Sequence, residues 1–600
     1  MSCVTPAQAE KRLMPINSAS SFRMSDIEKS VDKDPVKAIH LIGMYRIKYG
    51  EESIFPEEDS LSGTGDRLSV LEEQALENLK KSQALAIAEK RFDDAASLAR
   101  SLAIMGVAVE STGAEPDLIL ASAKEQLAAG NNLEAFLAAA RSHELKPLEA
   151  DDALVFLERA AKVKQRRTAA FFYAAAEERL SSSEPEKRAV LNQYSQYVSD
   201  QDAVSDMVKG VATVVIDRGY RVERGMGLPD RVLGSAFFVD ASGLLITNYH
   251  VIASEVDPSY EGYSRMFIRM GDSASARIPA KVLGWDKTLD LALIKADIVP
   301  EYVFSVTDRI VPLVGDTISA IGSPGGLEKT VTRGIVSAYG RRFLQIGDVI
   351  QMDAMVNHGN SGGPVIDPEG RLVGIVFAGI EQFPGVNFAV PAERLAAALP
   401  AMIKGGKAKR PWLGLTISET AQGAEIVYVA PYTPASEQQI PEGAMLEKIN
   451  GRIINAPQGA LIPAFQDLIF ADRPGELVSL ETSDGMRRVL MTVARPDLPL
   501  AAAVRVDTRE RLAAPLFGIV LSPAIESGAF SSTYQVKKVI RGSIGDEAGL
   551  SELDPISIRG FRVVEKEGYV LMDINVKKRR MGYLETNMRL PAALDLPDTL

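Results

Sequence analysis

The stretch Asn357-His358-Gly359-Asn360-Ser361-Gly362-Gly363-Pro364 decides how the rest of the sequence is interpreted. Glycines surround its one serine, which predicts a tight turn because glycine adopts backbone dihedrals that a Cβ would forbid. A turn of this kind leaves backbone amides exposed beside the hydroxyl. A serine hydroxyl is a weak nucleophile unless a neighbouring base takes its proton. A histidine and an orienting carboxylate are therefore expected elsewhere in the chain.

Four histidines are present, and their positions favour one of them as the base. His40 and His143 lie in helical sequence far upstream, and His358 is too close along the chain to approach Ser361 readily. We expect His358 at the rim of the cleft instead. His250 ends an apolar run that follows a turn, as expected at the end of a strand. A lone histidine there is more often structural, so the choice depends on its order relative to the other groups.

The orienting carboxylate should lie between His250 and Ser361. Asp290 opens the apolar segment 290–295 and is preferred, because an acid at the mouth of a buried strand can be held out of water against an imidazole N–H. Asp286 is the alternative, in a segment typical of a turn. A lone aspartate before a strand is usually only a turn residue.

The order of these groups along the chain discriminates between two folds. Residues 359–363 match the G-x-S-x-G elbow of α/β-hydrolases, but that fold requires a histidine after the serine and none follows Ser361. The order His…Asp…Ser is that of chymotrypsin-like double β-barrels. Short β-branched runs separated by Gly, Asp and Pro, from residue 208 to about 390, agree with an all-β double barrel.

Several motifs in this order resemble the trypsin-like protease domain of the HtrA (Deg) family, across residues 208–403. The motifs are Gly234-Ser235-Ala236-Phe237-Phe238, Thr247-Asn248-Tyr249-His250-Val251, Asp290-Leu291-Ala292-Leu293-Ile294, Ala320-Ile321-Gly322-Ser323-Pro324-Gly325-Gly326, Gly359-Asn360-Ser361-Gly362-Gly363-Pro364 and Asn387-Phe388-Ala389-Val390-Pro391. The resemblance implies His250 as base, Asp290 as orienting acid and Ser361 as nucleophile. It also implies an oxyanion hole made by the amides of Gly359 and Ser361. Such a reaction needs no metal or organic cofactor.

The same resemblance places Val356, Val386 and Phe388 at the border of the S1 pocket. An aliphatic pocket favours cleavage after small or medium apolar residues. Two positions depart from the family pattern: His358, where proline or arginine is frequent, and Asn387, where glycine is frequent. We expect Asn387 to narrow the substrate cleft or to disfavour the backbone geometry there. Neither departure removes a catalytic group.

Length and composition bound the remaining possibilities. At 600 residues the chain is too long for one hydrophobic core, and roughly three to five domains are expected. The net charge of −12 argues against nucleic acid as a general partner. The one cysteine, Cys3, rules out an internal disulfide framework, and no apolar run approaches the ~20 residues of a membrane span.

Two locations are compatible with the first residues of the sequence. No basic-then-apolar signal segment is present, which predicts a cytoplasmic protein if the start is genuine. The family resemblance implies the cell envelope or periplasm. The opening Met1-Ser2-Cys3 leaves open a second possibility, that Cys3 is a lipid-attachment residue exposed by removal of a signal peptide. The simplest interpretation of Cys3 is an unimportant terminal cysteine.

Before the protease-like segment the sequence is mostly helical. Residues 1–30 are polar and predicted to be a flexible lead, whereas 31–203 carry apolar residues at three-to-four spacing. Similar segments around Ala95, Ala135 and Ala169 are spaced by 40 and 34 residues, and 34 is the tetratricopeptide period. Two interpretations are open: a tetratricopeptide-like array with a concave face for a partner, or a plain helical domain that packs on the protease or drives assembly.

Two PDZ-like domains are expected after the protease-like domain of residues 204–403, at 411–498 and 504–600, with the basic segment 404–411 as a solvated linker. Leu413-Gly414-Leu415 resembles a PDZ carboxylate-binding loop, whose amides hold the end of a peptide that adds a strand to the sheet. A weaker copy begins at Phe517-Gly518-Ile519, and its later part is divergent. The complete expected fold is a helical region, an all-β double barrel and two α+β PDZ-like domains.

These features together predict a serine endopeptidase, and the family resemblance implies a role in protein quality control. Its substrates would be unfolded or damaged proteins, captured through the PDZ loops and cleaved through an acyl-enzyme. The resemblance implies assembly as a homotrimer, and the helical region is a further surface for a protein partner. Two alternatives are a proteolytically silent chaperone or adaptor, and a narrow regulatory protease that cuts one delivered partner.

Overall fold

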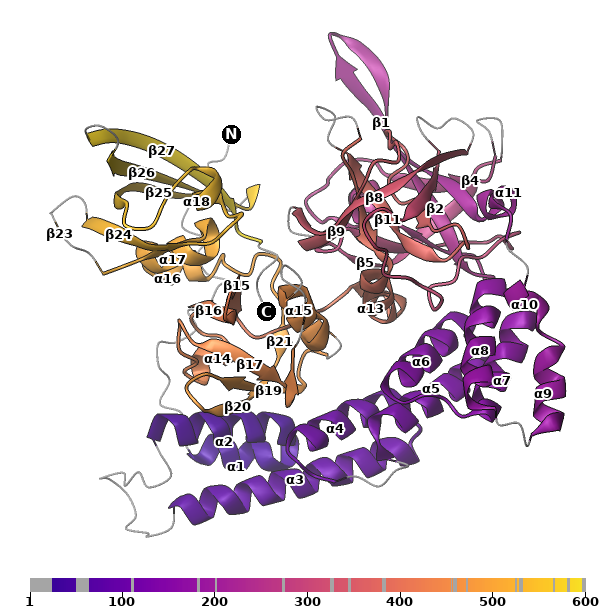
Figure 1. Ribbon diagram of the computed structural model, residues 1–600, viewed down its shortest axis with the longest axis horizontal. Helices are drawn as coiled ribbons and strands as arrows, with labels where there is room; N and C mark the ends of the chain where they lie inside the picture. The colour runs from indigo at the N-terminus through magenta and orange to yellow at the C-terminus, as the bar shows by residue number, and fades with distance from the viewer. Residues whose placement is uncertain are drawn as a thin grey trace, which may run out of the picture.

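The computed structural model contains a helical region and three β-rich domains (Figure 1). The helices run along one side of the molecule, beneath the protease-like domain at one end and the first PDZ-like domain at the other. The structure describes residues 24–49, 64–108, 113–180, 184–199, 202–271, 276–323, 329–343, 347–379, 385–454, 456, 461–470, 473–523, 526–527, 532–564, 567–579 and 583–595. Cys3 lies outside these residues.

The helical region begins earlier than the sequence suggested. Its first helix starts at Met24 and buries Ile27 and Val31, so part of the expected flexible lead is folded. The helices are α1 Met24–Lys33, α2 Pro35–Tyr49, α3 Thr64–Ala88, α4 Phe92–Ile104, α5 Glu115–Ala129, α6 Asn132–Leu145, α7 Ala150–Lys162, α8 Arg166–Arg179, α9 Pro185–Asn192, α10 Gln196–Ser199 and α11 Val204–Met207, followed by a 3₁₀ turn at Val208–Gly210.

Three helical hairpins, α3–α4, α5–α6 and α7–α8, repeat one turn. Each first helix ends near a residue of positive φ, at Lys90, Gly130 or Lys164, and these positions are 40 and 34 residues apart. In each turn the next amide bonds back to a carbonyl five residues earlier, as in a Schellman motif. The similar segments noticed in the sequence are thus one repeated hairpin. Its tetratricopeptide-like character stays a prediction.

The central domain is a pair of closed β-barrels, which confirms the expected double barrel. The first is a ring in the order β5-β4-β1-β2-β3-β6, closed by β5–β6 pairing, and the second is a ring in the order β10-β11-β12-β9-β8-β7. The elements are β1 Val211–Glu223, β2 Met226–Asp240, β3 Leu244–Thr247, α12 Tyr249–Val256, β4 Arg265–Arg269, β5 Ile278–Asp286, β6 Leu291–Ala296, β7 Thr317–Gly322, β8 Thr330–Phe343, β9 Gly347–Met352, β10 Pro364–Ile366, β11 Leu372–Gly379, β12 Asn387–Pro391 and α13 Ala392–Ile403.

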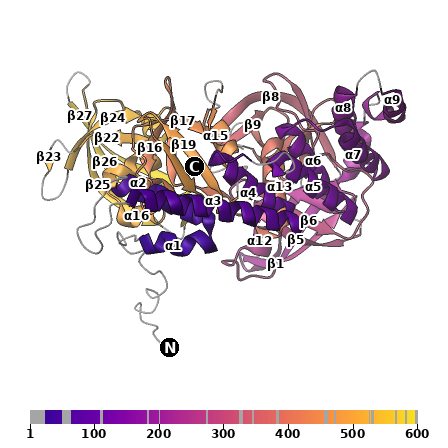
Figure 2. The same ribbon diagram turned by 90° about the horizontal axis from the view of Figure 1, so that it is seen from below.

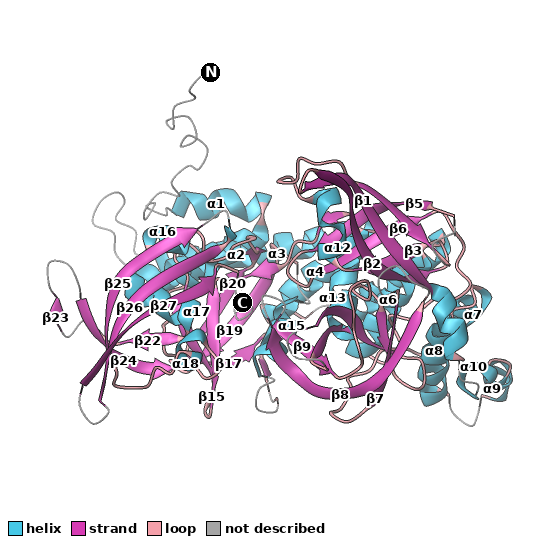
Figure 3. Ribbon diagram, turned by 90° about the horizontal axis from the view of Figure 1, so that it is seen from above, coloured by secondary structure: helices cyan, strands magenta, loops and turns pink. Residues whose placement is uncertain are grey.

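Two smaller β domains follow, and Figure 3 shows the first beside the barrels and the second at the far end of the molecule. The first contains β14 Pro411–Trp412, β15 Leu415–Thr420, β16 Gly423–Val429, α14 Pro434–Glu437, β17 Met445–Ile449, β18 Arg452–Ile453, α15 Leu461–Phe470, β19 Leu477–Thr482, β20 Arg487–Met491 and β21 Val493–Ala494. The second contains α16 Ala503–Val506, α17 Arg509–Phe517, β22 Ile519–Leu521, β23 Glu526–Ser527, β24 Ser532–Val539, α18 Ile544–Glu547, β25 Pro555–Val564, β26 Tyr569–Arg579 and β27 Tyr583–Ala593.

The N-terminal half of the helical region packs on the first PDZ-like domain, and Figure 2 shows α2 and α3 beneath it. Leu477 of β19 lies in one apolar cluster with residues of α1, α2, α3 and α4. Buried His40 of α2 contacts Glu437 through Nε2 at 3.0 Å, and its carbonyl accepts a hydrogen bond from Gln438. Arg100 of α4 pairs with the buried Glu476 at 2.5 Å. Apolar burial and these polar contacts thus hold the two parts together.

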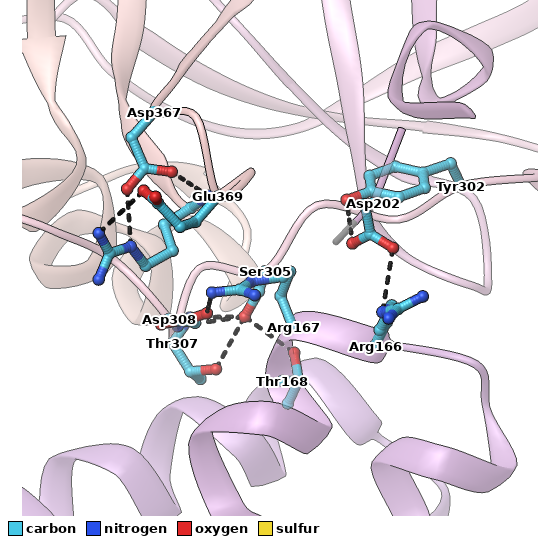
Figure 4. Close-up of polar contacts among 11 residues, drawn as sticks. Arg166, Arg167, Thr168, Asp202, Tyr302, Ser305, Thr307, Asp308, Asp367 and Glu369 are labelled. Carbon is cyan, nitrogen blue, oxygen red and sulfur yellow. Dashed lines mark hydrogen bonds and ion pairs between the residues drawn. The ribbon is translucent and has the colours of Figure 1, made fainter. Parts of the chain in front are cut away.

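The C-terminal half of the helical region packs on the protease-like domain. Leu133 and Leu137 of α6 lie in the same apolar cluster as residues of both barrels. Figure 4 shows the polar part of the contact, where Thr168 of α8 meets Ser305 at 2.9 Å and Arg167 pairs with Asp308 at 2.7 Å. The helical region therefore packs on both the protease-like domain and the first PDZ-like domain.

The segment after α13 is solvated only in part: Lys404, Lys407 and Lys409 are exposed, as expected, whereas the backbone is paired and Arg410 is largely buried. A short strand, β13 Gly406–Lys407, pairs in parallel with β5, and the Ala408 amide donates to the Trp285 carbonyl at 2.7 Å. Arg410 is largely buried against Asp286, at 2.6 Å. The basic residues suggested a solvent-exposed run, but one of them has a buried carboxylate partner.

No helix in the part of the chain that the structure describes is both long enough and apolar enough to cross a bilayer.

Candidate active site

His250 lies where the first barrel leads into a short helix. Strand β3 ends at Thr247 and α12 begins at Tyr249, so His250 is in the first helical turn rather than at the strand end. About half of its side chain is exposed. The position presents an imidazole to solvent and substrate from a rigid element.

Asp290 holds His250 in two places. Its Oδ2 lies 2.7 Å from His250 Nδ1, and its Oδ1 accepts the His250 backbone amide at 2.8 Å. An ionised carboxylate only accepts, so Nδ1 carries the proton and Nε2 is left as the basic nitrogen. The carboxylate thus sets the tautomer and the direction of the ring, as a general base requires.

The Asp290 backbone is also fixed. Its φ of +56° is a left-handed conformation, which aspartate tolerates better than most residues. Its carbonyl accepts the Tyr249 amide at 3.1 Å and the Asn248 side-chain amide at 2.9 Å. Burial, with smaller effects of Asp257 and Asp290, raises the pKa of Tyr249.

Asp286, the alternative acid, points elsewhere. Its Oδ1 accepts the Leu289 amide at 3.0 Å and its Oδ2 accepts Arg410 Nε at 2.6 Å. The two aspartates flank one turn between β5 and β6, and only Asp290 contacts the imidazole.

Ser235 of β2 fastens the loop that carries Ser361. Fully buried, it donates from Oγ to the Gly359 carbonyl at 2.7 Å, and its amide donates to the Ser361 carbonyl at 2.7 Å. Its own carbonyl accepts Thr247 Oγ1 at 2.7 Å, and its Oγ accepts the Ser323 amide at 3.0 Å. A residue of the first barrel thus positions the loop of the second. Ser235 lies in one of the recognised motifs, but its role was not anticipated.

The glycines of the Ser361 loop are required by its geometry. Gly359 and Gly362 have φ of +103° and +88°, and a Cβ on Gly362 would overlap the Ser235 carbonyl. The amides of Gly359 and Ser361 donate to no other residue that the structure describes. Two amides one residue apart can therefore stabilise an oxyanion.

Gly234 lies between the two halves of the site. A Cβ there would approach Val251 Cγ2 to 2.7 Å and the Ser361 carbonyl oxygen to 3.2 Å. Val251, the residue after His250, and the backbone of Ser361 therefore both pack against this glycine. The close packing leaves no space for a larger residue at this position.

The Ser361 hydroxyl is not yet paired with the base. Its Oγ donates to the Phe377 carbonyl at 3.4 Å, and no hydrogen bond joins it to His250 within the described residues. Catalytic hydrogen bonds are commonly long or misaligned before substrate binds. Rotation about χ1 of Ser361 is the smallest motion that changes its partner.

The residues expected around S1 differ in exposure. Phe388 is buried in the core that includes Phe377, whereas Val356 and Val386 are partly exposed. Asn387 is buried, and its side-chain amide donates to the Ala354 carbonyl at 2.9 Å. Asn387 thus ties β12 to the segment before the Ser361 loop.

Two of the other histidines, His40 and His143, have their partners elsewhere in the described structure. His40 lies in the contact with the first PDZ-like domain, and His143 Nδ1 accepts the Leu148 amide at 3.2 Å. His358 is exposed, directly before Gly359. These placements agree with the choice of His250.

The first PDZ-like domain has an edge strand with a helix packed against it. Strand β15 is at the edge of its sheet, α15 packs on it, and Leu413 and Leu415 are fully buried. Gly414 has φ of +90°, and a Cβ there would overlap the side chain of Thr433. Its carbonyl accepts the Ala430 amide at 2.8 Å, which directs the loop carbonyl into the domain.

The second PDZ-like domain is built differently. Phe517 and Ile519 are fully buried and Gly518 again has positive φ, at +69°. The chain after β25 returns directly as β26 in a long hairpin, with Val564 opposite Tyr569. The first domain has α15 between the corresponding strands. The second domain therefore has the loop and the edge strand β22, but no helix at the position of α15 among its described residues.

Comparison with known proteins gives a consistent assignment. Residues 234–375 match the family model of a trypsin-like peptidase domain, 500–594 that of a TP0546 family PDZ domain, and 18–118 that of a domain of unknown function, DUF8517. A probable periplasmic serine endoprotease DegP-like from Rhizobium meliloti is 34% identical over 260 residues, covering 40% of this chain and 50% of the relative. One of the same description from Marinomonas sp. is 31% identical over 354 residues, covering 55% of this chain and 71% of the relative.

Among solved structures, the serine endoprotease from Yersinia pestis is 27% identical with a TM-score of 0.37, covering 48% of this chain and 96% of that chain. The double barrel with its histidine, aspartate and serine defines a trypsin-like serine peptidase domain. The chain belongs to the HtrA family of DegP-like serine endoproteases. It spans about half the length of several of the curated relatives that it matches.

Proposed function

We propose that the chain is a serine endopeptidase that hydrolyses peptide bonds through an acyl-enzyme at Ser361. The observation that carries the proposal is the His250–Asp290 pair together with the Ser361 loop. In that loop the amides of Gly359 and Ser361 donate no hydrogen bond to another described residue. In the reaction, His250 Nε2 takes the Ser361 proton as Oγ attacks the scissile carbonyl. The amides of Gly359 and Ser361 stabilise the oxyanion, and His250 then protonates the leaving amine. Water then attacks the acyl-enzyme with His250 as the base, which releases the carboxylic acid product and restores the Ser361 hydroxyl.

Unfolded or damaged proteins are the proposed substrates. The edge strand β15 and the loop at Gly414 support capture of an extended peptide end by the first PDZ-like domain. The partly exposed Val356 and Val386 support an apolar S1 pocket. For the second domain we propose weaker peptide binding or none, because no helix follows β25 among the described residues.

The test is digestion of an unfolded protein such as casein by wild type and Ser361→Ala. We expect wild type to produce fragments and the variant to lose activity by more than about 10³-fold, because the nucleophile is absent. Equal loss of intact substrate in both would contradict the proposal. Undigested but aggregation-protected substrate in both would instead identify a proteolytically silent chaperone.

Delivery of one partner by the helical region requires a different experiment from simple deletion. Removing residues 1–200 would strip Leu133 and Leu137 from an apolar cluster shared with the barrels, so lost activity would not identify recruitment. Charge reversal at exposed positions away from both contacts, such as Lys80 and Lys81 of α3, is cleaner. Slower cleavage of a physiological partner with unchanged casein cleavage would support recruitment. Equal rates on both substrates would oppose it.

Location and assembly are further proposals. Both relatives are named as probable periplasmic endoproteases, and we propose a cell-envelope location for this chain. Cell fractionation tests the location, and mass spectrometry of the mature N-terminus tests lipid attachment at Cys3. A homotrimer is proposed from family resemblance alone, and light scattering of the full chain measures it.

A further inference from the structure

The turn between β5 and β6 carries the proposed catalytic acid and is held from outside the protease-like domain. It comprises four residues, 287–290, flanked by the paired residues Asp286 and Leu291. Asp290 ends the turn in a left-handed conformation, and its amide donates to the Lys287 carbonyl at 3.3 Å. In a turn this short, a displacement at one end also moves the other end. The contacts of Asp286 therefore affect the position of Asp290.

The anchor at Asp286 is a buried ion pair with a residue beyond the barrels. Arg410 Nε lies 2.6 Å from Asp286 Oδ2, while Oδ1 of the same carboxylate holds the Leu289 amide at 3.0 Å. Only 3% of the Asp286 side chain and 12% of the Arg410 side chain are exposed. A buried carboxylate that loses its cation is strongly destabilised, so the pair fixes both partners.

Arg410 itself sits at the junction of three domains. It directly precedes β14 of the first PDZ-like domain, and its carbonyl accepts the Arg495 amide at 2.8 Å. The side chain of Arg495 contacts Thr288 Oγ1 in the turn at 3.4 Å and pairs with Asp595, near the end of β27, at 2.5 Å. Segments before, between and after the PDZ-like domains therefore meet at this one turn.

The surrounding charges show that the site is a closed network rather than a surface pair. Lys407 pairs with Asp497, and Lys287 lies near both Lys407 and Asp595. Burial lowers the pKa of Arg410 while Asp286 opposes that shift. The described charged groups around Asp286 thus include Arg410, Lys287, Lys407, Arg495 and Asp595.

We propose that Arg410 is a positioning residue for peptide hydrolysis, acting through Asp286 on the turn that sets Asp290 and therefore His250. The inference rests on the proposed endopeptidase function. Its consequence is that the geometry of the catalytic base depends on how the PDZ-like domains are seated. Arg410 touches neither substrate nor the reacting atoms.

The experiment measures kcat, KM and the pH–rate profile of full-length Arg410→Gln on a fluorogenic peptide. We expect kcat to fall between about 10- and 100-fold with KM nearly unchanged, because small misplacement of a catalytic group costs rate rather than binding. We also expect the acid limb of the profile to move to lower pH, because a displaced Asp290 carboxylate stabilises the imidazolium less. A merely structural role would leave that limb in place.

Three further variants make the result specific. Arg410→Lys keeps the charge without the planar guanidinium, and we expect partial recovery of kcat. Arg410→Gln combined with Asp286→Asn should be no slower than Arg410→Gln alone, because both act through one contact. Arg371→Gln is the matched control, since Arg371 Nε also lies 2.6 Å from an aspartate oxygen, at Asp367, in a turn away from the triad. It should leave the profile unchanged.

Each possible result either supports or contradicts the positioning role of Arg410. If Arg410→Gln fails to fold, Asp286→Asn alone serves, because it keeps an acceptor for Leu289 while weakening the contact to Arg410, and the same kcat loss and acid-limb shift are expected. Wild-type kcat and pH profile in a folded Arg410 or Asp286 variant would overturn the inference while the endopeptidase function stands. Absence of hydrolysis by wild type would overturn both.

Discussion

The two halves of the active site are assembled in different ways. In the first barrel His250 and Asp290 are already joined, at 2.7 Å through the ring and 2.8 Å through the backbone. In the second barrel the Ser361 hydroxyl makes one long bond, 3.4 Å to the Phe377 carbonyl. The proposed base is therefore already oriented by its carboxylate, whereas the hydroxyl of the proposed nucleophile has a different hydrogen-bond partner. The position of Asp290 depends on the turn between β5 and β6, and the position of Ser361 depends on the glycine-rich loop before β10.

The largest effect in the first half should follow Asp290→Asn. An asparagine amide in place of the carboxylate favours the wrong imidazole tautomer, and we expect kcat to fall by about four orders of magnitude. Steady-state hydrolysis of a fluorogenic peptide measures the change. Asp286→Asn is the matched control and should cost about 10- to 100-fold. Equal losses in the two variants would contradict the assignment of Asp290.

In the second half, Ser235→Ala should have a smaller effect. It leaves the Gly359 carbonyl and the Ser323 amide without their partner, and we expect a displaced oxyanion amide to lower kcat by about 10²- to 10³-fold. Peptide hydrolysis with a parallel thermal melt separates this from unfolding. Ser101→Ala, a buried serine of α4, is the control. An unchanged kcat would show that the loop does not need the Ser235 contact.

The contact between the helical region and the barrels should matter for stability more than for rate. Leu133→Ala removes a buried side chain from the cluster shared with both barrels, and we expect a loss of about 2–5 kcal/mol in the free energy of unfolding. Urea denaturation of the full chain measures it. A loss near zero would mean that α6 does not contribute to the folded protease-like domain.

Thr168→Val should give the smallest effect. It removes the Thr168–Ser305 hydrogen bond and the longer contact from Thr168 to Gln165 Oε1 at 3.3 Å, with little change of shape. Ser305 keeps its contact with Thr307, so we expect a loss of about 1 kcal/mol. Neither half of the active site is touched, and kcat should match wild type. A large fall in kcat would show that the helical region acts on the active site directly.

The sequence predicted these candidate groups because chain order and glycine spacing can be read without knowing any contact. His250 and Asp290 were selected by their order before Ser361, and the turn around Ser361 by its glycines. The hydrogen bond from Ser235 to Gly359 could not be predicted, because the two residues are 124 positions apart and nothing in the local sequence marks the pairing. The choice between Asp286 and Asp290 likewise needed a partner, Arg410, that the sequence presents as part of a basic run.

The helical region shows the same limit on a larger scale. Its repeat was visible at Ala95, Ala135 and Ala169, and the three turns follow the same spacing. Which faces of the helices pack on other domains was not predictable, because alanine-rich helices are apolar on several faces. His40 is an example: nothing in its local sequence points to a carboxylate 397 residues away.

The most direct test is covalent labelling of Ser361 by a fluorophosphonate, followed by intact-mass and peptide mass spectrometry. The probe reacts with a serine that a neighbouring base activates, so labelling reports the assembled site without requiring a known substrate. We expect one adduct on Ser361 in wild type, none in Ser361→Ala, and labelling slower by more than about 10³-fold in His250→Ala. Equal labelling rates in wild type and His250→Ala, or no adduct in folded wild type, would contradict the account.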